Sequence, residues 1–145
     1  MSTLRQEEVL TFLQEIDSDV IPSLSSRKNL GDYSSKICRF SVCVVAWHEN
    51  HIVGLSSAYC NDLKTRIGFL TLIAVARDFR CQGLATDLLN ETIRVAKSKK
   101  MEKLILETNI NNKRAISLYI KRGFKVVEDE PKKNPTTVIM EYDLN

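Results

Sequence analysis

Hydrophobic side chains recur at helical spacing in the first forty residues. Val9, Leu13 and Ile16 lie three or four positions apart, which predicts an amphipathic helix. A polar, serine-rich stretch follows, and Leu30 and Ile37 then lie on one side of a second, shorter predicted helix. We therefore expect two helices before the first strand.

The pattern becomes strand-like between residues 40 and 75. Three segments are rich in β-branched and aromatic residues, namely Phe40–Trp47, Ile52–Tyr59 and Ile67–Val75. Short polar turns separate them. Because consecutive strands joined by short turns usually pair with each other, these segments predict an antiparallel meander.

The second half of the chain alternates helices and strands. The predicted elements are a helix over Leu84–Ala96, a strand over Leu104–Thr108, a helix over Asn112–Arg122 that ends at Gly123, and strands over Phe124–Val127 and Thr136–Leu144. This order predicts a mixed α/β domain built around a central sheet. With three prolines and five glycines the chain has no linker, so residues 1–145 are expected to form a single domain.

Length and composition narrow the class of protein. The chain has 145 residues, of which 43% are hydrophobic and 27% charged, the balance of a globular domain. No apolar run approaches the ~18 residues that a membrane span needs. The net charge of +3 is dispersed along the chain, which argues against nucleic-acid binding. Met1–Glu8 carries charged residues where a signal peptide would be apolar, so we expect a cytoplasmic protein.

The cysteines and histidines do not form a metal-ligating pattern. None of the four cysteines belongs to a C-x-x-C pair, and both histidines fall in a predicted turn. We therefore expect no metal site. Buried free thiols of a reducing compartment are the better interpretation of Cys38, Cys43, Cys60 and Cys81.

The junction between the third predicted strand and the next helix could bind an anion. A helix N-terminus offers unpaired N–H groups and a partial positive charge, and Gly83 lets the backbone approach a ligand closely. Gln82–Thr86 is therefore a candidate phosphate cradle, although an ordinary loop entering a helix has the same pattern. Neither G-x-x-x-x-G-K-[ST] nor G-x-G-x-x-G occurs, which argues against a nucleotide hydrolase or a dinucleotide oxidoreductase.

Two blocks in the second half carry fixed residue patterns. Arg80–Ala85 matches [RQ]-x-x-G-x-[GA] between a strand and a helix, and Asn112–Phe124 matches every fixed position of N-x-x-A-x-x-x-Y-x-x-x-G-F. With these blocks, residues 40–128 resemble the GNAT superfamily of N-acetyltransferases. The resemblance implies the GNAT fold, a mixed and mostly antiparallel central sheet flanked by helices. It also implies direct transfer of an acetyl group from acetyl-coenzyme A (acetyl-CoA) to a primary amine in a ternary complex, without a metal.

The resemblance assigns cofactor-binding roles by position. Ile73, Ala74 and Val75 match the strand whose backbone holds the pantetheine arm and the acetyl carbonyl, and a backbone N–H near Ile73 could bind the oxyanion. Asn112 matches the asparagine that contacts the cofactor arm. The loop whose amides bind the pyrophosphate corresponds to Arg80, Cys81, Gln82, Gly83, Leu84, Ala85 and Thr86.

The resemblance also implies two catalytic residues. Tyr119 matches the general acid, and a tyrosine, with a reference pKa of about 10, can donate a proton to a leaving thiolate. A core aromatic on an amphipathic helix is the alternative for Tyr119. Glu107 matches the general base of the branch that acetylates ribosomal-protein N-termini, but a solvated charge at a strand end fits equally well. Cys81 invites an acyl-enzyme, yet the family uses backbone at that position.

Two departures from the family pattern concern the acceptor. The family usually opens with a strand before its first helix, whereas here the helix comes almost at once, so the first edge strand is expected to be missing. Peptide N-terminal acetyltransferases often carry a paired tyrosine where this chain has Val127–Lys133, and its absence favours a small amine or amino sugar over a protein N-terminus. Ser23–Tyr33, with Arg27 and Lys28, and Asp129–Pro135 are expected to border the acceptor pocket.

Two other classes of function stay open at this point. A non-catalytic coenzyme A-binding sensor or partner module would keep the cradle, although the intact Tyr119 and Asn112 argue against it. A nucleic-acid interaction domain would show salt-dependent retention, which the dispersed charge disfavours. A homodimer fits the resemblance, because dimers are common among the proteins that this chain resembles.

Overall fold

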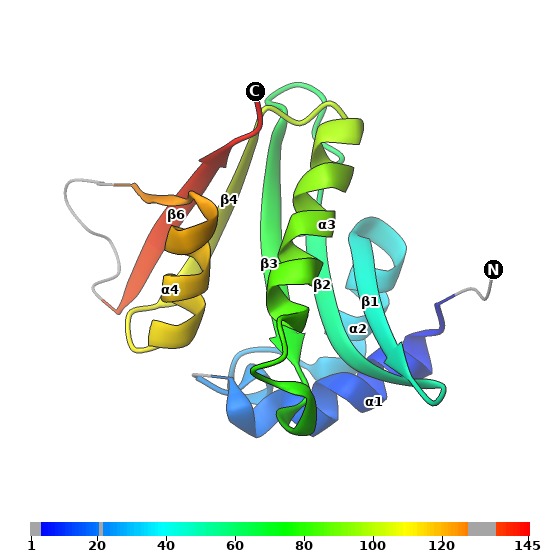
Figure 1. Cartoon of the computed structure of the whole chain (residues 1–145). Coiled ribbons are helices and arrows are strands. Elements are labelled where there is room, and N and C mark those ends of the chain that lie inside the picture. Colours follow the sequence, from blue (N-terminus) through cyan, green and yellow to red (C-terminus); the bar gives the residue numbers. More distant parts are fainter. Residues whose placement is uncertain (1–3, 21, 128–135) are drawn as a thin grey trace.

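Six strands form one sheet with helices on both of its faces (Figure 1). The computed structural model describes residues 4–20, 22–127 and 136–145. In chain order the α-helices and strands are α1 (Gln6–Ile16), α2 (Leu30–Phe40), β1 (Val42–His48), β2 (His51–Tyr59), β3 (Ile67–Val75), α3 (Leu84–Ser98), β4 (Lys103–Asn109), α4 (Lys113–Arg122), β5 (Lys125–Val126) and β6 (Thr137–Asp143). Three short 3₁₀ turns, η1 (Asp17–Asp19), η2 (Leu24–Ser26) and η3 (Arg77–Phe79), lie in the connections.

The sheet is mixed and mostly antiparallel, as the sequence predicted. Its strand order is β1-β2-β3-β4-β6-β5. Only β3 and β4 run parallel, and every other neighbouring pair is antiparallel. In the described part of the chain α1 is the first element, and β1 forms one edge of the sheet.

Most element boundaries differ from the sequence prediction by one or two residues, and two of the differences have a visible structural cause. Phe40 ends α2 instead of opening β1, because Ser41 caps the helix by donating from both its amide and its hydroxyl to the Ile37 carbonyl. The predicted strand after Gly123 shortens to two residues, and Phe124 is buried beneath α4 in place of pairing. Gly123 ends α4 with a φ of 111°, the left-handed conformation expected of a helix stop.

The sheet separates two hydrophobic cores. One core packs α1 and α2 against β2 and the end of β3, and it includes Phe12, Leu13, Ile37, Leu55 and Leu72. The other packs α3 and α4 against the opposite face, and it includes Leu70, Leu89, Ile93, Leu104, Tyr119 and Met140. Burial of these side chains supplies the main favourable term in folding.

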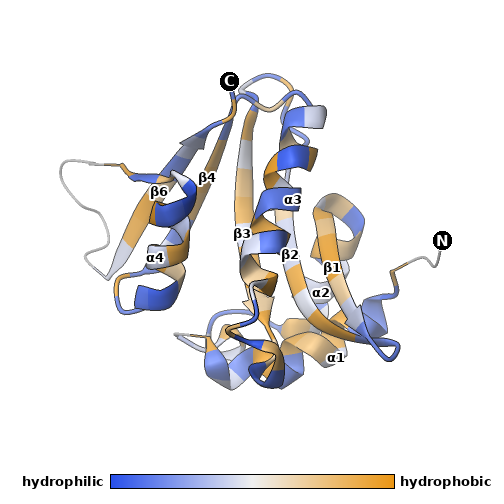
Figure 2. Ribbon diagram, in the orientation of Figure 1, coloured by the Kyte–Doolittle hydropathy of each residue, from blue (hydrophilic) through white to orange (hydrophobic). Residues whose placement is uncertain are grey.

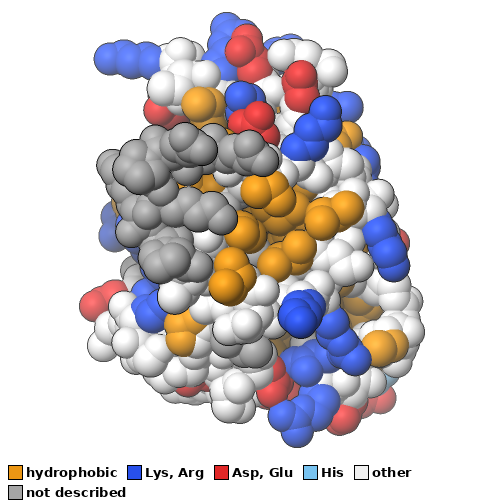
Figure 3. All heavy atoms as spheres, turned by 90° about the vertical axis from the view of Figure 1, so that its left-hand side faces the viewer, with side chains coloured by type: hydrophobic (Ala, Val, Ile, Leu, Met, Phe, Trp, Pro, Cys, Tyr) orange, Lys and Arg blue, Asp and Glu red, His pale blue; other side chains and the backbone are white. Residues whose placement is uncertain are grey.

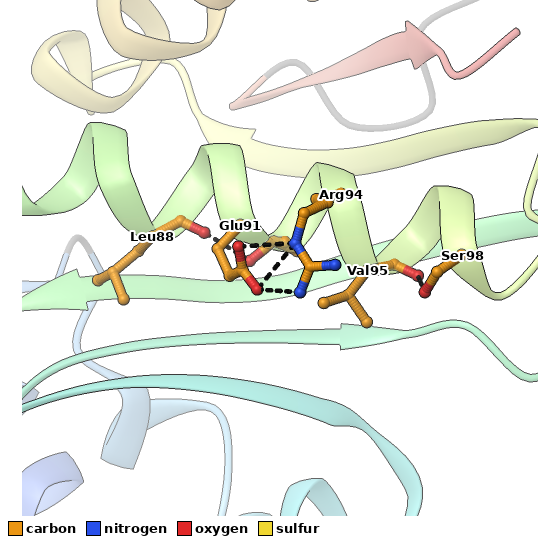
Figure 4. A network of polar contacts seen from close by, with 6 residues as sticks. Leu88, Glu91, Arg94, Val95 and Ser98 are labelled. Carbon is orange, nitrogen blue, oxygen red and sulfur yellow. Dashed lines mark hydrogen bonds and ion pairs between the residues drawn. The ribbon is translucent and has the colours of Figure 1, made fainter.

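Helix α3 runs alongside β2 and β3 on one face of the sheet and has one hydrophilic side (Figure 2). On that side Arg94 pairs with Glu91, with Nε to Oε2 at 2.9 Å, and the Ser98 hydroxyl donates to the Val95 carbonyl at 2.7 Å (Figure 4). On its buried side the Thr92 hydroxyl lies 2.7 Å from the Ser56 hydroxyl of β2. The contact between Thr92 and Ser56, together with the buried face of α3, holds the helix on the sheet, so its N-terminus has a defined position.

Candidate active site

Strands β3 and β4 pair over only part of their length. Their parallel register runs from Ile67 opposite Lys103 to Leu70 opposite Leu106 and then stops. Beyond that point β3 stays paired with β2, and β4 stays paired with β6. Figure 1 shows the two strands side by side at one end and apart at the other. The backbone edges of β3 and β4 therefore face each other across an opening.

A β-bulge lies where this opening begins. Ser57 of β2 pairs with Leu72 and Ala58 pairs with Leu70, so Thr71 is an extra residue on β3. The bulge reverses the alternation of side chains, because Leu70 points into the α3–α4 core whereas Leu72 points into the α1–α2 core. Ile73 then packs toward α3 and α4. After the bulge, the residues of β3 that border the opening therefore alternate in the shifted register.

Tyr33 of α2 supports the bulge from the other face of the sheet. Its hydroxyl lies 2.9 Å from the Thr71 hydroxyl and donates to the Thr71 carbonyl at 3.4 Å. Burial raises the pKa of Tyr33 to about 12, partly offset by the hydrogen bond with Thr71. Tyr33 ends the segment expected to border the acceptor pocket, but its contact with Thr71 was not predicted. Nothing in the local pattern marks the bulge, since β3 reads as a regular strand.

A cavity of about 830 Å³ occupies the opening between the two strands. Every predicted cofactor-binding and catalytic residue lines it except Gln82, whose side chain donates instead to the Asp78 carbonyl at 3.5 Å. The lining residues among the predicted set are Ile73, Ala74, Val75, Arg80, Cys81, Gly83, Leu84, Ala85, Thr86, Glu107, Asn112 and Tyr119. The structure thus brings together residues that lie up to 46 positions apart in the chain.

The N-terminus of α3 presents unpaired amides to this cavity. Gly83 caps the helix with a φ of 85°, and no side chain caps it. The first backbone bond runs from the Asp87 amide to the Gly83 carbonyl at 3.0 Å, which leaves the amides of Leu84, Ala85 and Thr86 without backbone partners. A Cβ built on Gly83 would meet nothing within 4 Å, so the space in front of the turn is open. These features fit a diphosphate group.

Cys81 differs from the sequence expectation of a buried thiol. It is exposed in the turn before α3, with a φ of 62°. Among the other cysteines, Cys60 is buried, whereas Cys38 and Cys43 are only partly buried. The prediction of buried thiols is therefore wrong for Cys81, because the tight turn directs its side chain outward while its backbone follows the cradle.

Arg80 is held by protein groups. Its Nε donates to the Val75 carbonyl at 3.0 Å, and its Nη2 lies 2.8 Å from an Asp19 oxygen. Arg77 approaches the other oxygen of Asp19 at 2.7 Å. Hydrogen bonds from Arg77 and then Arg80 lower the pKa of Asp19, whose side chain is 13% exposed. Asp19, which the sequence analysis missed, thereby ties the α1–α2 connection to the end of β3 and the cradle.

Tyr119 reaches the cavity from α4. Its ring is buried at 6% exposure and lies 5.6 Å from the Phe124 ring between centroids. No described residue makes a hydrogen bond to its hydroxyl, and the hydroxyl oxygen is not completely shielded from solvent. Burial raises the pKa of Tyr119, which keeps the phenol protonated. Asn112 precedes the same helix, and its amide donates to the Thr108 hydroxyl at 3.3 Å.

Glu107 lies on the opposite wall, on β4. It is exposed, and the Thr137 hydroxyl of β6 donates to its Oε1 at 2.8 Å. This bond fixes one oxygen of the carboxylate and leaves the other available to water or to a ligand. The position is compatible with proton acceptance and equally with a solvated strand end, so the role of Glu107 stays a prediction.

The connection between α1 and α2 forms the remaining wall. Pro22, Leu24, Arg27 and Lys28 line the cavity there, within or beside the segment expected to border the acceptor. The second expected segment, Asp129–Pro135, lies outside the described residues.

In Figure 3, hydrophobic side chains gather at the centre of the face that carries β6, with Lys and Arg side chains below them. No group of three or more metal-ligating side chains occurs in residues 4–20, 22–127 and 136–145, and no described helix could span a membrane.

Two curated relatives cover part of this chain. N-alpha-acetyltransferase 30 of Schizosaccharomyces pombe is 33% identical over 57 residues, which is 39% of this chain and 38% of the relative. N-alpha-acetyltransferase MAK3 of Arabidopsis thaliana is 27% identical over 124 residues, which is 81% of this chain and 65% of the relative. The chain thus spans less than two thirds of the length of either relative.

A solved structure and a family sequence model cover more of the chain. The PaiA N-acetyltransferase of Thermoplasma acidophilum, solved in complex with coenzyme A, has a TM-score of 0.73 and 16% identity, covering 98% of this chain and 96% of that one. At that identity the likeness shows the fold. The sequence model of the acetyltransferase (GNAT) family matches residues 10–124. The family match, the shared fold and the opening between β3 and β4 agree, and the chain belongs to the GNAT family of acetyltransferases.

Proposed function

We propose that this chain transfers the acetyl group of acetyl-CoA to a primary amine by direct attack within a ternary complex. The observation that carries the proposal is that the strand opening, the unpaired amides of α3 and the Tyr119 hydroxyl all border one cavity. A diphosphate at the cradle would let an extended arm run along the free edge of β3. The thioester would then lie within the opening.

The proposed reaction needs two proton transfers. The amine nitrogen forms a bond to the thioester carbonyl carbon as the carbon–sulfur bond breaks. The leaving thiolate takes a proton from the Tyr119 hydroxyl, whose burial keeps it protonated until that moment. The surplus proton of the amine passes to Glu107, directly or through water. Glu107 then releases this proton to solvent, and Tyr119 takes one proton back from solvent. Backbone N–H groups on the free edge of β3 near Ile73 are suited to bind the carbonyl oxygen.

The identity of the acceptor rests on two opposing arguments. The relatives are named N-alpha-acetyltransferases, which favours the α-amino group of a protein N-terminus. The absence of a tyrosine from Val127–Lys133 favours a small amine or an amino sugar. The common proposal is a primary amine, and the two classes form separate arms of the test.

Calorimetry and thiol release together test the proposed function. We expect acetyl-CoA to bind with micromolar affinity, and we expect one class of amine to release free coenzyme A from it. Binding without release from small amines, amino sugars or peptides would support the alternative of a coenzyme A-binding sensor. No binding of acetyl-CoA would contradict the assignment of the cradle itself.

A further inference from the structure

Some of the positively charged side chains around the cavity pair with a carboxylate, and others do not. Arg77 and Arg80 share the carboxylate of Asp19. Arg27 and Lys28 also line the cavity region at the α1–α2 connection, but neither makes an ion pair with a carboxylate of the described residues. The wall formed by this connection therefore carries positive charge that the described part of the protein does not neutralise.

Aromatic side chains hold two of the local lysines against the sheet. The Lys28 ammonium lies 4.9 Å from the centre of the Tyr33 ring, and the hydroxyl of that same ring contacts Thr71 at the start of the strand opening. The Lys36 ammonium lies 5.9 Å from the Tyr59 ring, and Tyr59 pairs with the cavity residue Phe69. The contact with Tyr33 restricts the long side chain of Lys28 and keeps its charge at the cavity that Lys28 lines.

The cations of this wall also repel one another. Partial burial, followed by the charges of Arg27 and Lys36, lowers the pKa of Lys28. Repulsion among like charges without a counter-ion is unfavourable, and an anion bound between them would relieve it. Across the opening from β3, the carboxylate of Glu107 on β4 lines the cavity, as does Arg114 of α4.

Resting on the proposed function, we infer that the acceptor carries an anionic group, a carboxylate or a phosphate, in addition to its amine. Arg27 and Lys28 bind the anionic group, and Glu107 faces the amine. This arrangement orients a dipolar acceptor, because reversing it would bring like charges together at both ends. The unpaired amides of α3, which packs on the other face of the sheet, remain for the phosphates of acetyl-CoA.

Matched pairs of amines test this inference. The pairs are a β-amino acid and its amide, an amino sugar phosphate and the free amino sugar, and two peptides with Asp or Asn as their second residue. We expect at least one anionic member to have a kcat/KM about tenfold or more above that of its neutral partner. Which pair shows the preference distinguishes a small acceptor from an acidic protein N-terminus, and a carboxylate from a phosphate.

A double variant connects the preference to the two cations. In Arg27→Gln with Lys28→Gln, the ratio of kcat/KM between the anionic and neutral members should fall toward one, while the affinity for acetyl-CoA is kept. The control replaces two exposed lysines that do not line the cavity, Lys97→Gln with Lys121→Gln, and should keep the ratio. Comparing ratios removes the intrinsic reactivity of each amine.

Several results would overturn the inference. Equal or better turnover of the neutral members is one, and an unchanged ratio in the double variant is another. A double variant that weakens acetyl-CoA binding with no change in the ratio would assign the cations to the cosubstrate. If no probe is acetylated, calorimetry of the anionic and neutral members with the coenzyme A complex decides, since equal binding also contradicts the inference. Failure to bind acetyl-CoA at all would instead refute the proposed function.

Discussion

At the scale of single residues, two buried tyrosines have different surroundings. The hydroxyl of Tyr33 is engaged with Thr71, whereas that of Tyr119 borders the cavity without a described partner. Burial raises the pKa of both phenols. Only Tyr119 therefore combines a retained proton with a hydroxyl that is available to a ligand.

Replacing Tyr119 tests its role as the acid. Tyr119→Phe keeps the ring beside Phe124 and removes only the hydroxyl. We expect kcat to fall ~10²-fold or more, the usual scale of lost general-acid catalysis. Calorimetry should find the acetyl-CoA affinity unchanged. Near-normal turnover in this variant would transfer the acid role to another group.

Replacing Glu107 tests its role as the base. A carboxylate accepts a proton only when it is ionised, so catalysis by Glu107 predicts a rate that falls toward acidic pH. Glu107→Gln cannot titrate and should remove this acidic limb of the pH–rate profile, together with most of the rate. Thr137→Val is the matched variant, since it keeps the carboxylate and removes only its hydrogen-bond donor. An acidic limb that persists in Glu107→Gln would belong to the amine or to another residue.

At the scale of elements, the cradle depends on one turn and one helix end. Cys81 and Gly83 both have positive φ, which folds the chain so that α3 begins with its amides toward the cavity. The partial positive charge of a helix N-terminus favours an anion there. A negative side chain at Gly83 would occupy the open space in front of these amides.

Two nearly isosteric substitutions separate charge from backbone strain at Gly83. Asp and Asn tolerate a positive φ about equally, so both variants carry similar strain. Gly83→Asp adds a charge that repels the diphosphate, and we expect it to abolish acetyl-CoA binding in calorimetry. Gly83→Asn should weaken binding less, by about tenfold. Equal affinities for the two variants would mean that no phosphate binds at this turn.

The link between the α1–α2 connection and the cradle makes a second prediction at this scale. Asp19→Asn removes the charge that holds Arg77 and Arg80 together. The freed arginines should loosen the end of β3, and we expect the acetyl-CoA Kd to rise on the order of tenfold. Asp78→Asn is the control, because it removes one exposed charge from η3, the turn that contains Arg77, without breaking an ion pair. Losing a negative charge alone should not raise the Kd of an anionic ligand, so Asp78→Asn should show no rise. The same rise in both variants would mean a general disturbance of this region, and not the loss of the link.

Local patterns explain which parts of the site could be predicted. The cradle and α4 were predictable, since Gly83, Gly123 and the helix periodicity of Tyr119 are encoded within short segments. The ties to Asp19 and Thr71 were not, because their partners lie 58, 61 and 38 positions away in the chain. Such contacts follow from packing between elements and leave no periodic signal in the sequence.

At the scale of the whole molecule, the sheet divides the protein into two halves that meet at the cavity. Helices α1 and α2 bring Asp19, Arg27 and Lys28 from one face, whereas α3 and α4 bring the cradle and Tyr119 from the other. Each core therefore positions one side of the opening. The geometry of the site therefore depends on both cores being folded.

Alkaline pH offers a measurement of that stability. Burial raises the pKa of Cys38, Cys43 and Cys60 and of the tyrosines Tyr33 and Tyr119. These groups stay protonated in the folded state after they have ionised in the unfolded state. The unfolded state then binds fewer protons, so the free energy of unfolding falls as pH rises. The loss should begin near pH 8.5 with the thiols and steepen above pH 10 with the tyrosines.

The Tyr33 share of this loss can be isolated. Its pKa of about 12 lies two units above the ordinary value of 10.0, and each unit corresponds to about 1.4 kcal/mol. Wild-type protein should therefore lose about 2–3 kcal/mol more than Tyr33→Phe between pH 9 and pH 12 in urea unfolding curves. Because Tyr33→Phe also loses the contact with Thr71, the comparison uses the change with pH and not the absolute stability. Parallel curves for the two proteins would mean that Tyr33 is solvated in the native state, and the support that it gives to the bulge at Thr71 would then be wrong.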